Sequence, residues 1–191
     1  MTQVVALMLA AGFGRRFGSD KRRAVLADGR TLLAASLERA RAVFEEVLLV
    51  LRADDDPAAL GLPADSVIVR CVDAEQGMGH SLAAGARCLD GHPAAACAVL
   101  LGDMPWIADA SLRALVDKAA PGRIVFPLYR GERGHPVLFG RDFWPELQRL
   151  TGDEGARKVL RAHPAAWTAV EVDDPGVLGD VDSPAALGGE R

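Results

Sequence analysis

A glycine-rich, basic segment near the N-terminus carries the clearest chemical signal in this chain of 191 residues. It follows the apolar run 4–9 and reads LAAGFGRRFGSDK from Leu9 to Lys21. Glycines after a buried strand let backbone N–H groups approach phosphate oxygens, and Arg15, Arg16 and Lys21 would neutralise phosphate charge. The segment therefore predicts a phosphate-binding loop, the alternative being a solvated basic loop.

The spacing within this loop excludes the two commonest phosphate-binding motifs. A dinucleotide fingerprint G-x-G-x-x-G would need glycine where Phe17 stands, and its helix would begin at once. The next helical pattern starts only after Thr31. A P-loop needs G-x-x-x-x-G-K-[ST], which the GSDK sequence ending at Lys21 does not match. The loop is therefore expected to bind phosphates in another way.

Two aspartates are candidates for a metal site. Asp103 comes soon after the apolar run 96–101, and Asp182 ends the acidic segment 171–182. Because Mg²⁺ prefers one or two carboxylates together with substrate oxygens, this pair would suit a bound nucleotide. Each residue also has a plainer interpretation, since aspartates are common in turns and Asp182 could cap a short last helix. The residues alone leave both interpretations open.

Two further segments place polar side chains beside glycines. In segment 76–85 (QGMGHSLAAG), Ser81 and the first amides of a helix would face a ligand, or Ser81 would only cap that helix. In segment 133–136 (RGHP), the imidazole of His135 could meet a phosphate, or His135 could be a turn residue. The four histidines show no HxH or HExxH spacing and the three cysteines form no CxxC, so no zinc or disulfide framework is predicted.

Alternating apolar runs and helical patterns predict how these residues are positioned. Buried strands are expected at 4–9, 47–51, 67–69, 96–101, 124–127 and 167–172. Helices are expected at 32–44, 81–89, 110–118, 141–150 and 154–163, and 129–139 is typical of a turn and β-arm. This order predicts an α/β fold with a mostly parallel, helix-covered sheet, in which ligands bind at the carboxyl ends of the strands.

Composition excludes several classes of function. The net charge of −4 argues against a general nucleic-acid binder. No apolar run approaches the roughly 20 residues that a membrane span needs, and no signal peptide is recognisable. We therefore expect a cytoplasmic protein with a single domain and no membrane partner.

Four motifs, in this order, resemble the MobA-like NTP transferase family, and most closely its molybdenum cofactor cytidylyltransferase branch. They are LAAG-x-G-x-R-x-G with Lys21, LGDMP around Asp103, RGHPVLF with the later GDEGAR ending at Arg157, and DVDSP around Asp182. The resemblance implies a Rossmann-like three-layer nucleotidyltransferase fold over residues 1–191, with helices on both faces of the sheet. It also implies a nucleotide-binding half over 1–105 and an acceptor-binding half over 106–191.

The same resemblance implies a Mg²⁺-dependent enzyme that moves CMP from CTP to the phosphate of molybdopterin and releases pyrophosphate. A molybdoenzyme would then receive the finished cofactor. The implied catalytic residues are Arg16, Lys21 and Asp103, and the implied metal ligands are Asp103 and Asp182. Nucleotide contacts are implied for Leu9, Ala10, Ala11, Gly12, Gly14, Arg16, Lys21, Gly77 and Ser81, and acceptor contacts for Gly134, His135 and Pro136.

Several residues depart from this family pattern. Phe17, Arg22, Arg23 and His80 stand where other residues are common, whereas Ala11 favours the cytidylyl branch over the guanylyl branch. The alternatives are a guanylyltransferase, a nucleotidyltransferase acting on a sugar phosphate or another metabolite, and a non-catalytic nucleotide- or cofactor-binding chaperone.

Overall fold

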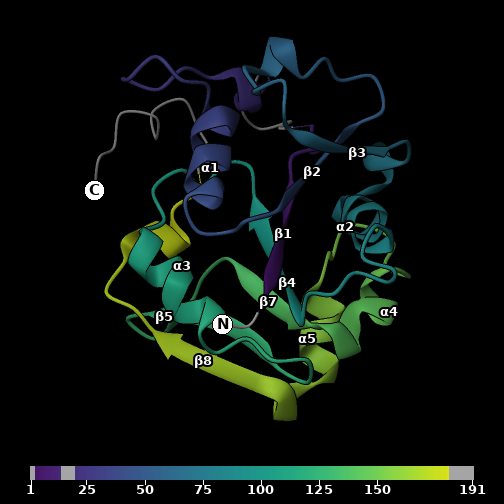
Figure 1. Ribbon diagram of the computed structural model, residues 1–191, viewed down its shortest axis with the longest axis vertical. Helices are drawn as coiled ribbons and strands as arrows, with labels where there is room; N and C mark the ends of the chain where they lie inside the picture. The colour runs from purple at the N-terminus through teal and green to yellow at the C-terminus, as the bar shows by residue number, and fades with distance from the viewer. Residues whose placement is uncertain (1–2, 14–19, 181–191) are drawn as a thin grey trace.

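The computed structural model describes residues 3–13 and 20–180, and these residues build one mixed sheet (Figure 1). Its strands are β1 (Val4–Leu9), β2 (Val47–Arg52), β3 (Val67–Cys71), β4 (Ala96–Leu101), β5 (Ile124–Tyr129), β6 (Glu132–Arg133), β7 (Val137–Gly140) and β8 (Trp167–Glu171). The α-helices are α1 (Leu32–Arg41), α2 (Met78–Arg87), α3 (Asp109–Val116), α4 (Trp144–Leu147) and α5 (Arg157–Ala162). Short 3₁₀ helices include η1 (Lys21–Arg23) and η6 (Pro175–Leu178).

The strand order is β3-β2-β1-β4-β7-β5-β6, with β8 paired to β5. Strands β1 to β4 are parallel, and β7 enters antiparallel between β4 and β5. The segment predicted as a β-arm is thus a hairpin, in which β6 and β7 both return along β5. The predicted α/β fold with a mostly parallel sheet is confirmed.

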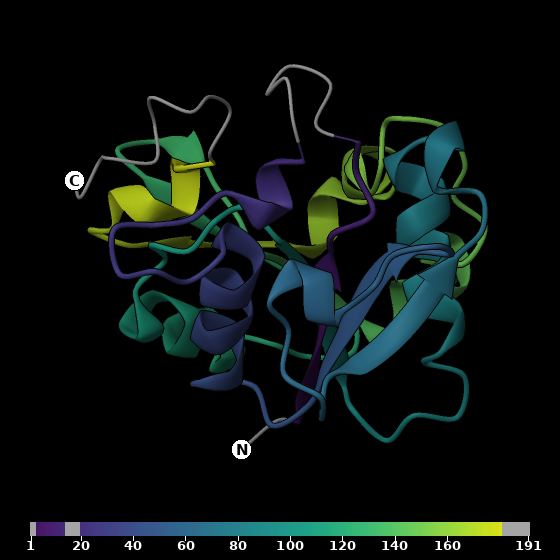
Figure 2. The same cartoon turned by 90° about the horizontal axis from the view of Figure 1, so that it is seen from above.

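Helices cover both faces of the sheet because apolar side chains alternate along its buried strands. In β1, Val5 and Leu7 face a core shared with α2, α4 and α5, whereas Ala6 and Met8 face a core shared with α1 and α3. Figure 2 shows the same three layers, with α1 and α3 on one side of the sheet and α2 and α5 on the other. Both faces of the sheet are covered by packed cores. A ligand would therefore bind at the edge of the sheet where the strands end.

Helix boundaries differ from the predicted ones in two informative places. Helix α2 begins at Met78, after Gly77, which adopts a φ of +118° that favours glycine. Ser81 therefore lies inside α2, 5% exposed, and is not its N-cap. The predicted helix 141–150 is a 3₁₀ turn followed by the short α4. Among helices in the described ranges, none combines the length and apolarity needed to cross a bilayer.

Candidate active site

The glycine loop begins where β1 and β4 end side by side. Leu9 pairs with Leu101, and the Gly102 N–H donates to the Leu9 carbonyl at 3.0 Å. The side chains of Ala10 and Ala11 are buried in the two cores, and the Ala10 N–H donates to the Val50 carbonyl at 2.9 Å. A Cβ on Gly12 would have no neighbour within 4 Å, so packing within the described protein does not require glycine there. Gly14 and Arg16, predicted in the same loop, lie outside the described residues.

Lys21 and Asp103, which are 82 positions apart in the sequence, meet at this edge. The Lys21 Nζ lies 2.5 Å from Asp103 Oδ2, and the two side chains are 22% and 15% exposed. Asp103 follows β4, and Lys21 opens η1, whose N-cap Asp20 accepts from the Arg22 N–H. Two of the predicted catalytic residues are thus in direct contact at the carboxyl ends of parallel strands, where ligands bind in such sheets.

His135 is held against the same centre by the β5–β7 hairpin. Its backbone N–H donates to the Val177 carbonyl at 2.8 Å, and the peptide bond to Pro136 is cis. A side chain on Gly134 would reach within 2.5 Å of the Val177 carbonyl oxygen, so glycine lets the hairpin lie directly on η6. Within the described part of the chain, the buried Nδ1 of His135 has no hydrogen-bond partner. Gly134, His135 and Pro136 therefore form a tightly packed segment against η6, in which one polar atom is buried without a partner in the described residues.

Charged groups around His135 act on it in opposite directions. Burial lowers the pKa of His135, the carboxylates of Asp103 and Asp180 oppose that shift, and the positive charge of Arg157 adds to it. Arg157 stands at the start of α5, and Asp180 follows η6. The site thus gathers two carboxylates, an imidazole and an arginine from four separate segments.

The lowered pKa of His135 predicts a pH dependence of stability. Because the unfolded chain binds a proton near its ordinary pKa of about 6.5 and the folded chain binds it only at lower pH, stability falls as pH decreases through that window. Urea unfolding between pH 5 and pH 7.5 should show a weaker dependence in His135→Asn than in the wild type. An equal dependence in both proteins would contradict the burial of a neutral imidazole.

Asp174, in the acidic segment 171–182, has a structural role. Asp174 is 7% exposed, and its two carboxylate oxygens accept from the N–H groups of Gly176 and Ala108, both at 2.9 Å. Asp174 therefore fixes η6 to the start of α3. Asp182, the second predicted metal ligand, lies outside the described residues. In the ranges that the structure describes, no three His, Cys, Asp or Glu residues cluster as a ready metal site.

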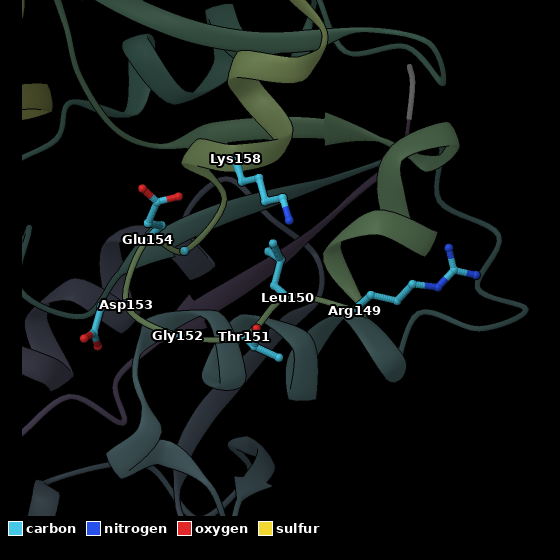
Figure 3. Close-up of a pocket in the computed structure, with 8 residues that line it drawn as sticks. Arg149, Leu150, Thr151, Gly152, Asp153, Glu154 and Lys158 are labelled. Carbon is cyan, nitrogen blue, oxygen red and sulfur yellow. The ribbon is translucent and has the colours of Figure 1, made fainter.

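The start of α2 packs on the loop 149–155, and Figure 3 shows the small pocket that this loop and Lys158 line. The Gly79 N–H donates to the Gly152 carbonyl at 2.7 Å, and Nδ1 of His80 accepts from the Gly152 N–H at 3.3 Å. A Cβ on Gly77 would come within 2.5 Å of the Gly152 carbonyl oxygen. Packing against this loop therefore accounts for Gly77 and for the unusual His80, and the pocket's lining does not include the Lys21–Asp103 pair.

A buried arginine that the sequence analysis treated only as a departure lies beneath the glycine loop. Arg22 is 5% exposed and forms bidentate pairs with Asp20 (2.8 and 2.6 Å) and Asp55 (2.5 and 2.8 Å). Its Nη1 also donates to the Ala10 carbonyl at 2.8 Å. Burial by itself would lower the pKa of Arg22, but the two carboxylates raise it above its ordinary value. The guanidinium is therefore permanently charged and fully engaged.

A second arginine continues this network. Arg52, the last residue of β2, donates from Nε to the Ala11 carbonyl at 3.2 Å and from Nη2 to the Gly12 carbonyl. Its guanidinium carbon lies 4.0 Å from the ring centroid of Phe13, and its backbone N–H donates to Asp55 Oδ2 at 2.9 Å. The carbonyls of three successive loop residues are thus held by two arginines. The only signal in the sequence was the run of charged residues after the loop, which is typical of a solvated surface.

The fold and the site together define a Rossmann-like α/β protein of the nucleotidyltransferase class. The MobA-like NTP transferase domain matches residues 6–167. The chain belongs to the MobA-like NTP transferase family.

Several known proteins are similar to this chain over most of its length. The purine catabolism protein PucB of Bacillus subtilis is 31% identical, over 95% of this chain and 92% of its own length. The nicotine blue oxidoreductase of Paenarthrobacter nicotinovorans is 29% identical, over 94% and 92%. The crystal structure of Rv0371c from Mycobacterium tuberculosis superposes with a TM-score of 0.82 at 31% identity, over 97% and 95% of the two chains. A structure of Rv0371c in complex with manganese superposes with a TM-score of 0.75 at 29% identity, over 93% of this chain and 94% of that one.

Proposed function

We propose that this protein is a Mg²⁺-dependent cytidylyltransferase that moves CMP from CTP to the phosphate of molybdopterin and releases pyrophosphate. The observation that carries the proposal is the contact between Lys21 and Asp103 at the carboxyl ends of β1 and β4, beside His135. Membership of the family supports nucleotidyl transfer in general. Ala11 and the RGHPVLF motif favour the cytidylyl branch and are the basis for choosing CTP.

The carboxylate chemistry of Asp103 and Asp182 suits a magnesium ion. Asp103 would hold the ion as a carboxylate ligand and Asp182 would be the second, and Mg²⁺ takes its other ligands from water and phosphate oxygens. A cation of this kind needs no cluster of three protein ligands. The manganese complex of Rv0371c supports a divalent cation in this fold. When bound, such an ion would supply positive charge that neutralises the phosphates during transfer.

The protein's own residues would supply position and charge. Lys21 and Arg16 would hold the triphosphate and stabilise the negative charge that develops on the departing pyrophosphate. An acceptor phosphate has its second pKa near ~6, so it is largely ionised at pH 7 and attacks without a strong general base. His135, whose pKa is lowered, would be neutral at pH 7 and would line the acceptor side of the site. Arg157 would add positive charge on the same side.

Ligand binding gives the first test of this function. Thermal unfolding would be followed with CTP, GTP, ATP, UTP and NADH, each with and without Mg²⁺. A nucleotide at 100 times its Kd should stabilise the protein by about 2.7 kcal/mol. We expect the Mg²⁺-dependent shift with CTP, followed by release of one pyrophosphate for each CMP transferred to molybdopterin.

The other outcomes separate the alternatives. A shift with GTP or UTP would keep the transferase class and redirect the search to the guanylyl reaction or to a sugar phosphate. A shift with CTP that leaves CTP intact beside molybdopterin would favour a non-catalytic carrier. A shift with NADH alone, or with none of these ligands, would contradict the proposed function.

A further inference from the structure

We infer that Arg22 is a positioning residue of the nucleotide site, which presets both the backbone of residues 10–12 and the ammonium group of Lys21. This role rests on the proposed function, because it concerns the same nucleotide site. Its basis is the complete use of the Arg22 guanidinium, which carries five N–H donors in a fixed planar geometry. Five hydrogen bonds leave this group toward Asp20, Asp55 and the Ala10 carbonyl.

The partners of Arg22 lie on three separate segments that must meet at the site. Asp55 follows β2, Ala10 follows β1, and Asp20 caps η1. Asp55 in turn accepts from the backbone N–H of Arg52, the residue that holds the Ala11 and Gly12 carbonyls. The buried guanidinium of Arg22 thereby fixes the backbone of residues 10–12 relative to the ends of β1 and β2.

The same group fixes Lys21. Lys21 and Arg22 are consecutive in the three-residue helix η1, whose N-cap Asp20 is paired with Arg22. Because η1 is too short to be stable alone, its orientation depends on this pairing. Movement of Arg22 would therefore displace the Lys21 ammonium from its contact with Asp103.

Electrostatic interactions hold Arg22, Asp20 and Asp55 together as ion pairs. Burial by itself would raise the pKa of Asp20 and Asp55, but the hydrogen bonds and charge of Arg22 lower it below the ordinary value in both. Removing the guanidinium would leave two carboxylates close together without their main partner, which is costly in a partly buried place. A loop anchored in this way presents phosphate-binding groups without reorganisation when the nucleotide arrives.

Nucleotide affinity in Arg22→Met and Arg22→Lys tests this role. Isothermal titration with CTP and Mg²⁺, well below the melting temperature of each variant, should give a Kd raised about tenfold or more in Arg22→Met, because binding would then have to order the loop backbone and the Lys21 ammonium group. Arg22→Lys retains the charge but loses the planar fork, so its Kd should lie between those of Arg22→Met and the wild type. Hydrogen–deuterium exchange should be faster in the variants for peptides that cover residues 4–13 and 47–56.

Two control variants separate positioning from loss of stability. Arg23→Met removes the same charge from the exposed neighbour in η1 and should leave the Kd unchanged. Leu89→Ala removes a side chain that is 1% exposed, beyond the end of α2 that lies farthest from Gly77. It should lower the melting temperature and leave the Kd within about twofold, because the loss of stability is distant from the site.

The outcomes distinguish this inference from the proposed function. If the wild type binds CTP and Arg22→Met binds it equally well, the positioning role is wrong and the function stands. If Leu89→Ala weakens binding as much as Arg22→Met does, the effect is one of stability and the role is again wrong. A wild type that binds no nucleotide would overturn the proposed function and this role with it.

Discussion

Asp103→Asn is expected to lower Mg²⁺-dependent nucleotidyl transfer by about 10³-fold or more, because it removes the carboxylate that would hold the metal and that contacts Lys21. The substitution preserves the shape of the side chain, and Asp103 is partly exposed, so the variant should fold. The measurement is pyrophosphate release from CTP in the presence of molybdopterin over a range of Mg²⁺ concentrations. A loss of rate that high Mg²⁺ partly restores would indicate weakened metal binding.

Asp109→Asn is the matched control for this experiment. Asp109 begins α3, is partly exposed and pairs with Arg39 at 2.8 Å, away from the glycine loop. Removal of its charge should leave the rate unchanged. Full activity in folded Asp103→Asn would show that Asp103 is not a metal ligand, whatever the role of Lys21.

Lys21→Met is expected to lower kcat/KM by about 10²–10³-fold, the usual cost of removing one group that stabilises charge in a transition state. Methionine keeps most of the aliphatic stem and lacks the ammonium group. If Lys21 acts mainly on the departing pyrophosphate, kcat falls more than KM rises. Arg16→Ala, in the undescribed part of the loop, should show a loss of the same order.

Lys118→Met provides the comparison, since Lys118 is an exposed lysine that follows α3. Its kinetic constants should equal those of the wild type. An unchanged kcat/KM in Lys21→Met would remove Lys21 from the catalytic residues and leave its contact with Asp103 as a structural feature only.

The middle of the sheet was predictable from sequence because β1, β2 and β4 are buried on both faces. Continuous apolar runs such as 4–9 and 96–101 are typical of such strands, and they coincide with β1 and β4. Helix boundaries were harder, because they depend on contacts made by distant residues. The start of α2 at Met78 follows from the conformation of Gly77 against the Gly152 carbonyl, which no local pattern contains.

The sequence predicted which residues to consider for the site, but it did not predict which of them touch. Motif position identified Lys21, Asp103 and His135, but only the folded sheet shows Lys21 and Asp103 in contact across 82 positions. Arg22 was missed for a physical reason: a lysine followed by two arginines is typical of a solvated surface, and its burial depends on carboxylates supplied by Asp20 and the distant Asp55. Charge patterns indicate burial only when all the partners are known.

Strand β7 lies between β4 and β5 and thereby ties the first part of the chain to the last part. A fragment ending at residue 105 would leave the β4 edge without the backbone partners at 137–140, and we expect such an unpaired edge to associate with other chains. The proposed nucleotide half (1–105) and acceptor half (106–191) would therefore not be exchangeable modules. If the hairpin binds the acceptor as proposed, a change of acceptor would arise by substitution of its side chains, while the backbone pairing of β7 with β4 and β5 stays the same.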